Sequence, residues 1–222
     1  MGICNEQAGI NGQVGRQTDG PPESLPSCRP VGFVDIDSGA SVVDLGCGAG
    51  EGVIRAAQRV GALGRVFGID RDSVKIGLAS QAVREAGLEV ECTITLKVAD
   101  IGLLPHPKTY ADILVSNGVF HLCPDKEKLF RNVFRILRPG GRLVFSTIVV
   151  SLDVKSASEE ILSGLEPEAR YFSLLTGMSF TDVRVLARQP LATDGSGKSV
   201  GQPVDKGAAV VVFSALKPPL NC

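Results

Sequence analysis

Aromatic residues are scarce in this sequence, which has no tryptophan, two tyrosines and nine phenylalanines. The 44% of hydrophobic residues can still form a core, and we expect that core to be aliphatic. Charge of one sign is not in excess either, because 23 Lys and Arg are balanced by 24 Asp and Glu, a formal net charge of -1. Without a basic face, binding to DNA or RNA is not expected.

Long apolar runs and paired cysteines are also missing. An apolar stretch such as 143–150 is far shorter than the roughly 20 residues that span a bilayer, so no membrane span is predicted. Residues 1–13 lack the basic and apolar parts of a secretory signal, which predicts a cytoplasmic protein. Reduced cysteines and no structural metal site are expected, because no CxxC pair occurs among Cys4, Cys28, Cys47, Cys92, Cys123 and Cys222. No feature indicates an oligomeric state.

The chain divides into a short arm and one domain. Residues 1–28 are rich in Gly, Asn, Gln, Ser and Pro without apolar periodicity, which predicts a flexible N-terminal arm. The rest, 29–217, has the length of one domain with one core. Apolar strand patterns at 41–45, 65–70, 91–98, 111–116 and 142–150 alternate there with helical patterns at 50–60, 72–86 and 125–137. This alternation predicts an α/β fold with a parallel sheet covered on both faces.

Two helical patterns have apolar stripes that we expect to face the core. The first stripe is Val74, Leu78 and Ala82, with Asp72 as N-cap and Gly87 as C-terminal stop. The second runs from Leu129 to Leu137 and is ended by the Pro-Gly-Gly turn at 139–141.

The last part of the chain has a different pattern. A helical stretch at about 156–176 precedes two strand patterns, 182–187 and 208–216, which flank a glycine-rich segment at 192–207. These strands predict a C-terminal antiparallel hairpin, which completes a doubly wound, mostly parallel seven-stranded sheet.

Glycines cluster after the first strand, in the segment Asp44-Leu45-Gly46-Cys47-Gly48-Ala49-Gly50. Glycines at the start of a helix let a ligand approach the backbone closely. The dinucleotide pattern Gly-x-Gly-x-x-Gly fails here, because Glu51 or Val53 stands where its last glycine is required. A carboxylate at Glu51 would also repel a pyrophosphate, which argues against a nicotinamide-dependent oxidoreductase.

Carboxylates follow the next two strands. Asp70 ends the second strand, where it can accept both hydroxyls of a ribose, and Arg71 follows it directly. Asp100 follows the third strand and is suited to accept from an adenine amine, while Ile101 packs against the ring. A solvated loop aspartate is the alternative for Asp100.

Polar residues also follow the fourth strand, beside the first strand, where doubly wound sheets bind ligands. Asn117 offers a carbonyl or side-chain oxygen to an ammonium group. His121 has a pKa suited to a general base, or it shapes a pocket without reacting.

Taken together, these segments resemble the class I S-adenosylmethionine-dependent methyltransferases. In that resemblance Asp44 to Gly50 is the glycine loop, Asp70 the ribose carboxylate, Asp100 the adenine carboxylate, and 137–143 the turn into the fifth strand. It implies a Rossmann-like methyltransferase domain at 29–217, S-adenosyl-L-methionine as cofactor, and a small-molecule acceptor. A related protein that binds the cofactor without catalysis is the non-enzyme alternative.

Residues 116–127 and 28–52 are similar to the arsenite methyltransferase branch of that class. The resemblance implies thiolates that bind trivalent arsenic, but a cysteine expected near Val53 is absent and residues 151–221 contain none. Cys28 alone matches an expected thiol. The resemblance therefore predicts the cofactor half of such an enzyme without most of its arsenic ligands.

Overall fold

The computed structural model describes residues 29–103, 110–150, 164–191 and 207–220. Its strands are β1 Ser41–Leu45, β2 Arg65–Asp70, β3 Thr93–Val98, β4 Ala111–Asn117, β5 Leu137–Val150, β6 Thr181–Pro190 and β7 Ala208–Leu216. Its α-helices are α1 Glu51–Val60, α2 Ser73–Glu85, α3 Lys126–Ile136 and α5 Glu168–Gly177. Short 3-10 turns are η1 Pro30–Phe33, η2 Leu88–Val90, η3 Ile101–Leu103 and η4 Phe120–Leu122.

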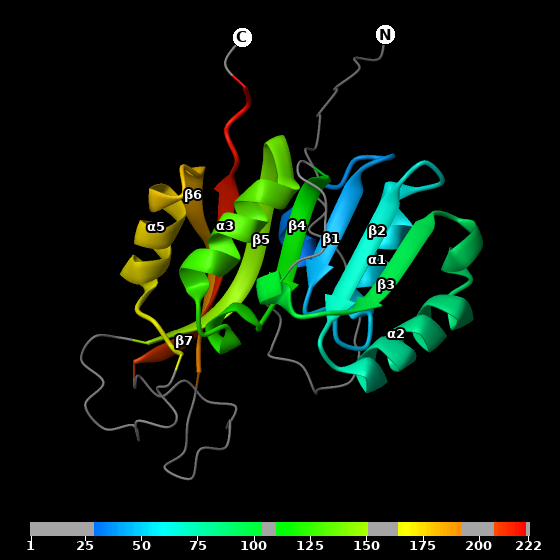
Figure 1. Ribbon diagram of the computed structural model, residues 1–222, viewed down its shortest axis with the longest axis horizontal. Coiled ribbons are helices and arrows are strands. Elements are labelled where there is room, and N and C mark those ends of the chain that lie inside the picture. The colour runs from blue at the N-terminus through cyan, green and yellow to red at the C-terminus, as the bar shows by residue number, and fades with distance from the viewer. Residues whose placement is uncertain (1–28, 104–109, 151–163, 192–206, 221–222) are drawn as a thin grey trace, which may run out of the picture.

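All seven strands form one sheet in the order β3-β2-β1-β4-β5-β7-β6 (Figure 1). The strands β1 to β5 pair in parallel, whereas β7 is antiparallel to both β5 and β6. The strand order reverses between β1 and β4, so the carboxyl ends of these two strands border the crevice in which such sheets bind ligands. The predicted doubly wound sheet and its antiparallel C-terminal hairpin are confirmed.

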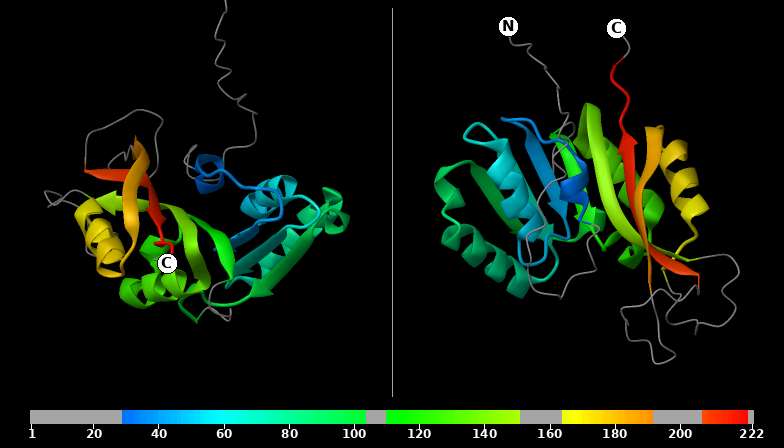
Figure 2. Two further views of the ribbon diagram at one scale, coloured as in Figure 1. Left: turned by 90° about the horizontal axis from the view of Figure 1, so that it is seen from above. Right: turned by 180° about the vertical axis from the view of Figure 1, so that it is seen from behind.

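Helices cover both faces of the sheet (Figure 2). On one face α1, α2 and η1 pack against side chains such as Val42, Val66 and Val115. On the other face α3 and α5 pack against the alternate side chains, among them Val43 and Leu114. This alternation buries both faces of the central strands, which explains their continuous apolar sequences. None of the helices in the described ranges has the length and apolarity that a membrane-spanning helix requires.

The expectation of an aliphatic core is wrong for the face under α3 and α5. The side chains of Phe120, Phe130, Phe145, Tyr171 and Phe213 are fully buried there. Their rings contact one another, with centroids 4.6 Å apart for the stacked pair Phe120 and Phe145 and 5.1 Å apart for Phe145 and Phe213. The few aromatic residues of the chain are concentrated in one cluster rather than spread through the core.

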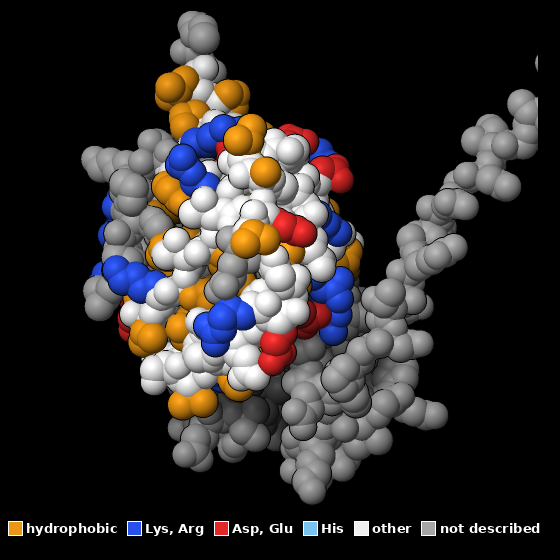
Figure 3. Space-filling view, turned by 90° about the vertical axis from the view of Figure 1, so that its right-hand side faces the viewer, with side chains coloured by type: hydrophobic (Ala, Val, Ile, Leu, Met, Phe, Trp, Pro, Cys, Tyr) orange, Lys and Arg blue, Asp and Glu red, His pale blue; other side chains and the backbone are white. Residues whose placement is uncertain are grey.

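The capping of α2 is confirmed, but its buried stripe is not the predicted one. Asp72 Oδ1 accepts the backbone N–H groups of Val74 and Lys75, and Gly87 follows the helix with a φ of +68°. Val74 and Leu78 are 70% and 51% exposed, whereas Ile76, Ala79 and Val83 face the sheet. The predicted stripe and the observed one both have helical spacing, and the sheet packs against the observed one, Ile76, Ala79 and Val83. Exposed hydrophobic side chains are not unusual for this protein, since they are scattered among polar ones on the face that Figure 3 shows.

The fifth strand begins at Leu137 rather than at Arg142. Leu137 pairs with Ala111 and Arg142 with Ile113, so the Pro-Gly-Gly segment is an irregularity within the strand. Gly141 is required there, because a Cβ atom at this position would lie 2.8 Å from the carbonyl oxygen of Arg138. The predicted helix at 156–176 is observed in its second half as α5, Glu168–Gly177, whereas its part at 156–163 lies outside the described residues. The predicted arm at 1–28 and most of the loop at 192–207 also lie outside them.

Candidate functional site

The glycine loop connects β1 to α1 at the carboxyl edge of the sheet. Gly46, Gly48 and Gly50 all have positive φ values, +73°, +54° and +92°. The N–H groups of Gly46 and Cys47 donate to the carbonyl oxygen of Ile69 at 2.8 and 2.9 Å. The loop is therefore fixed to the end of β2, where the predicted ribose carboxylate stands.

The space around each glycine shows which of them are packing positions. A Cβ atom on Gly46 would collide with the side chain of Val119, and one on Gly50 would lie 2.9 Å from the Cβ of Ala79. A Cβ atom on Gly48 would meet nothing within 4 Å. Gly48 thus borders open space, and a ligand can reach the backbone there.

Asp70 forms hydrogen bonds both with this loop and with the start of α2. Its Oδ2 accepts the N–H of Gly48 at 2.9 Å, and its Oδ1 accepts the N–H of Asp72 at 3.0 Å. A carboxylate oxygen can accept a second hydrogen bond, so each oxygen of Asp70 can also receive one from a ribose hydroxyl. Arg71, which was predicted to bind the cofactor together with Asp70, is exposed in the bend that leads to α2.

Asp44 lies buried beneath the glycine loop. Burial raises the pKa of its carboxyl from 3.8 to about 7, and the nearby Asp70 adds to this effect. A Cβ atom on Gly52 would collide with Asp44 Oδ2, so α1 begins directly over the carboxylate. A positive charge bound above the loop would favour ionisation of Asp44.

The side chain of Cys47 does not face the open space in front of the loop. It packs with the buried cluster that contains Val53 and Val66, and burial raises the pKa of its thiol far above the ordinary value. Only the backbone of Cys47 is therefore placed to meet a ligand.

Glu51 weakens one of the two arguments against a dinucleotide. Its Oε1 pairs with Arg29 at 2.6 Å and with Arg55 at 3.2 Å, and the carboxylate is half exposed. These cations offset the charge that was expected to repel a pyrophosphate. The failed glycine spacing is unaffected.

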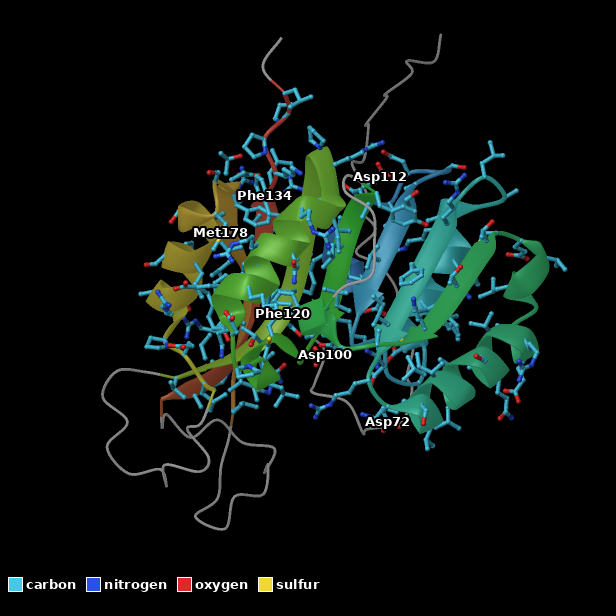
Figure 4. All side chains as sticks on the ribbon, in the orientation of Figure 1. Asp72, Asp100, Asp112, Phe120, Phe134 and Met178 are labelled. Atoms are coloured by element: carbon cyan, nitrogen blue, oxygen red, sulfur yellow. The ribbon has the colours of Figure 1, made fainter. Side chains whose placement is uncertain are left out.

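Asp100 and Ile101 lie at the end of β3, on the same edge as Asp72 (Figure 4). Asp100 is exposed, and its Oδ1 accepts the N–H of Gly102 at 2.7 Å. The carbonyl of Gly102 in turn accepts from Asn132 of α3 at 3.0 Å, which fixes this loop. Ile101 is half-buried against the core under α3. Within the described ranges the second carboxylate oxygen of Asp100 accepts no hydrogen bond and can receive one from a ligand.

Asn117 ends β4 beside the glycine loop. Its side-chain Oδ1 accepts from the hydroxyl of Ser146 at 2.5 Å, and the N–H of Gly118 donates to the Ser146 carbonyl at 3.0 Å. Ser146 was not singled out in the sequence, because only the pairing of β4 with β5 brings it here. The bond leaves the Asn117 amide fixed in orientation.

Contacts of neighbouring residues fix the position of His121. Its neighbour Phe120 is buried in the aromatic cluster, and Lys126 Nζ donates to the carbonyl oxygen of His121 at 3.5 Å and of Cys123 at 3.1 Å. The imidazole is half-buried, and its pKa is lowered by burial and by the charge of Lys126. Thr147 Oγ1 lies 3.5 Å from its Nδ1, a contact that the sequence pattern did not reveal.

The thiols within the described ranges do not converge. Cys47 and Cys92 pack in the cluster under α1 and α2, whereas Cys123 packs on the opposite face of the sheet. Within those same ranges no three His, Cys, Asp or Glu side chains are grouped to hold a metal ion. Cys28 lies outside the described residues.

A cavity of about 670 Å³ lies at the other edge of the sheet, where the strands begin. Its wall includes Asp112, which Figure 4 shows at the end of β4 remote from Asp100. The arginines in the wall are already paired: Arg138 with Asp112, and Arg142 and Arg184 with Asp182. The cavity is thus separate from the carboxyl-edge site.

Comparison with known sequences gives the chain a family. The family model described as a methyltransferase domain matches residues 36–182. The arsenite methyltransferase of Halobacterium salinarum is 32% identical over 67% of this chain and 39% of its own length. The rat arsenite methyltransferase is 33% identical over 64% of this chain and 36% of its own. The chain thus spans less than half the length of these relatives.

Solved structures share the fold. An arsenic(III) S-adenosylmethionine methyltransferase from Chlamydomonas reinhardtii superposes with a TM-score of 0.70 at 24% identity, over 85% of this chain and 66% of its own. The phosphoethanolamine N-methyltransferase 2 of Haemonchus contortus, solved with S-adenosylhomocysteine, gives 0.65 at 20% identity, over 82% and 49%. The [4+2]-cyclase SpnF gives 0.63 at 18% identity, over 83% and 77%, so the fold alone does not define the reaction.

The family model covers well over half of the chain, and the glycine loop, Asp70, Asp100 and Asn117 follow β1, β2, β3 and β4 at one edge of the sheet. The resemblance found in the sequence is therefore confirmed, and this chain belongs to the methyltransferase domain family.

Proposed function

We propose that this chain is an S-adenosylmethionine-dependent methyltransferase that acts on a small-molecule acceptor in the cytoplasm. The observation that carries the proposal is Asp70, whose carboxylate binds the glycine loop at Gly48 while keeping acceptor capacity on both oxygens. One of the superposed structures is of an S-adenosylmethionine methyltransferase, and another was solved with S-adenosylhomocysteine, the demethylated cofactor. The sequence similarity to arsenite methyltransferases supports the same chemistry.

The residues fit the cofactor in order along the sheet edge. Asp70 would accept the ribose hydroxyls, with Arg71 beside it, and Asp100 and Ile101 would contact the adenine. The backbone at Gly46, Cys47, Gly48 and Gly50, with Asn117, would border the methionyl end, and Asp44 beneath them would favour its positive charges. The bound cofactor supplies a methyl group on a sulfonium, which transfers when an acceptor is aligned with it.

His121 is the residue that we assign to the acceptor. It follows β4, next to the loop that begins with Asn117, and is half-buried. It acts there either as a general base or as a hydrogen-bond donor to the acceptor. We expect arsenite to be a poor acceptor or none, because the described thiols lie on opposite faces of the sheet.

Ligand-dependent stability tests the cofactor. S-adenosylhomocysteine at about 100 times its Kd should stabilise the folded chain by about 2.7 kcal/mol, whereas NADH should not. Melting curves with each ligand measure this difference. Stabilisation by NADH alone would favour the oxidoreductase alternative.

Turnover needs a second measurement, since a non-catalytic protein could also bind the cofactor. Mass spectrometry of small-molecule extracts incubated with the protein and methyl-labelled cofactor should reveal a labelled product. Binding without any labelled product across a broad acceptor panel would favour the non-catalytic alternative.

A further inference from the structure

Three polar side chains form a line behind His121. Tyr171 Oη of α5 lies 3.2 Å from Thr147 Oγ1 of β5, and Thr147 Oγ1 lies 3.5 Å from Nδ1 of His121. Neither Tyr171 nor Thr147 has solvent exposure. The line therefore runs from the buried aromatic cluster outward to the half-buried imidazole.

The first member must donate its proton. The Tyr171 ring is enclosed by Phe130, Phe145 and Phe213, and in the described part of the chain its hydroxyl has one hydrogen-bond partner, Thr147. Burial raises the pKa of this phenol to about 12, so it stays protonated at neutral pH. A buried O–H with a single neighbour donates to it, because the unpaired donor would cost roughly 1–3 kcal/mol.

The second member, Thr147, accepts from Tyr171 and donates to His121. Once Thr147 Oγ1 accepts from Tyr171, its own proton needs an acceptor, and Nδ1 of His121 is the remaining side-chain partner in the described ranges. An imidazole nitrogen accepts only when it carries no proton. If Nδ1 of His121 donated to Thr147 instead, Thr147 Oγ1 would accept from both Tyr171 and His121. The Thr147 hydroxyl proton would then lose Nδ1 as its acceptor.

We infer that Tyr171 and Thr147 hold His121 as the neutral tautomer with its proton on Nε2. The two residues are positioning residues, because they act through the imidazole. The charged groups near this line are Lys126, which donates to the backbone of His121, and Glu166, whose charge acts on Tyr171. Lys126 opposes a positive imidazole, so the neutral form is favoured.

The neutral tautomer with its proton on Nε2 decides whether His121 acts as a general base or as a hydrogen-bond donor. This conclusion about the acceptor rests on the proposed function. On the side away from Thr147 the imidazole presents Nε2–H, a donor, and it has no free lone pair for a proton. In the transfer step the acceptor's lone pair forms the new bond to the methyl carbon, and the electrons of the broken carbon–sulfur bond stay on sulfur. No proton passes to His121.

The substrate class is narrowed accordingly. The methylated atom must already have an available lone pair at neutral pH, as a thiolate, a neutral amine or a stabilised carbanion does. The same molecule must carry an oxygen or nitrogen that can accept from Nε2–H. An alcohol whose proton would have to be removed by His121 is excluded.

The tautomer can be read directly by NMR of the full chain labelled with ¹⁵N, because it has only two histidines, His106 and His121. The variant His106→Gln assigns the His121 signals. Long-range ¹H–¹⁵N correlations should show a protonated Nε2 and an unprotonated Nδ1 at pH 7. Tyr171→Phe frees Thr147 to accept and should shift the population toward protonated Nδ1, and Thr147→Val should leave a mixture.

The control variant is Thr176→Val, because Thr176 is exposed on α5 and, among the described residues, its hydroxyl donates to carbonyl oxygens of the same helix. It should leave the imidazole signals unchanged. Protonated Nδ1 in the unmodified chain would overturn the inference. So would a tautomer that stays the same as in the unmodified chain in both Tyr171→Phe and Thr147→Val. The cofactor proposal is judged separately by S-adenosylhomocysteine binding, which these signals do not require.

Discussion

The N–H of Gly48 donates to Oδ2 of Asp70 at 2.9 Å, so the glycine loop after β1 is held by the residue that ends β2. The carboxylate that we propose as the ribose ligand is thus also the side chain that holds the glycine loop. Its loss should affect both the site and the fold, and the two effects can be measured independently.

Asp70→Ala should weaken binding of S-adenosylhomocysteine by about 1.5–3 kcal/mol, the range for hydrogen bonds to a charged group. It should also lower the free energy of unfolding, because the N–H groups of Gly48 and Asp72 lose their acceptor. Calorimetry and urea unfolding measure the two quantities.

The matched control is Asp72→Ala, two residues along the chain. Asp72 caps α2, so its loss should cost about 1 kcal/mol of stability and leave the affinity unchanged. Equal affinities for the Asp70 and Asp72 variants would show that Asp70 is not a ligand.

Asp44 should make stability depend on pH. The pKa of its carboxyl is about 7 in the folded chain against 3.8 for the free group, so the folded state binds the proton more tightly. The associated stability is fully present below pH 3.8 and is lost as the pH rises through about 7. The whole effect is on the order of 4 kcal/mol as an upper bound.

Asp44→Asn should remove this part of the pH dependence, so the variant gains stability relative to the unmodified chain as the pH rises from 4 to 8. Urea unfolding across this range measures it. The control is Asp125→Asn, a cap at the exposed start of α3. If the free energies of unfolding of Asp44→Asn and of the unmodified chain differed by the same amount at every pH, the raised pKa of Asp44 would be contradicted.

Gly46 and Gly48 make a second matched pair. Both have positive φ, but only at Gly46 would a Cβ collide with Val119. Gly48→Ala should cost roughly 1–2 kcal/mol from the left-handed backbone, and Gly46→Ala about 1–3 kcal/mol more from overpacking. Unfolding midpoints measure both, and Val119→Ala should restore only the additional loss. Equal losses for the two variants would mean that the loop can move away from Val119.

Arsenite should be a poor substrate or none. Trivalent arsenic needs converging thiolates, and Cys47 and Cys123 lie on opposite faces of the sheet. Chromatography of methylated arsenic, after incubation with cofactor and a thiol reductant, measures the activity. Methylation that Cys28→Ser abolishes would show that this thiol has partners after all, and Cys47→Ser and Cys123→Ser would then identify them.

The features predicted best from the sequence are local ones. The strand, the glycine loop and the carboxylate after the next strand follow one another within about 30 residues, and the Asp72 cap depends only on the first turn of its helix. Parallel strands then necessarily bring Asp70, Asp100 and Asn117 to one edge.

The features predicted worst depend on contacts between distant segments. Val74 and Ile76 both begin apolar stripes on α2, and only the docking on the sheet selects Ile76. The contact of Thr147 with both His121 and Tyr171 joins three elements, and no spacing along the chain indicates it. The concentration of Phe120, Phe145 and Phe213 in one cluster has the same long-range origin.

The position of β7 between β5 and β6 imposes an order of assembly on the growing polypeptide. On emerging from the ribosome, β6 lacks its partner, because β7, its one neighbour among the described strands, is synthesised after it. Until then the edge of β5 has unpaired backbone groups beside the apolar run 143–145. Between synthesis of β5 and of β7, this edge is therefore a place at which a nascent chain is open to aggregation and to capture by chaperones.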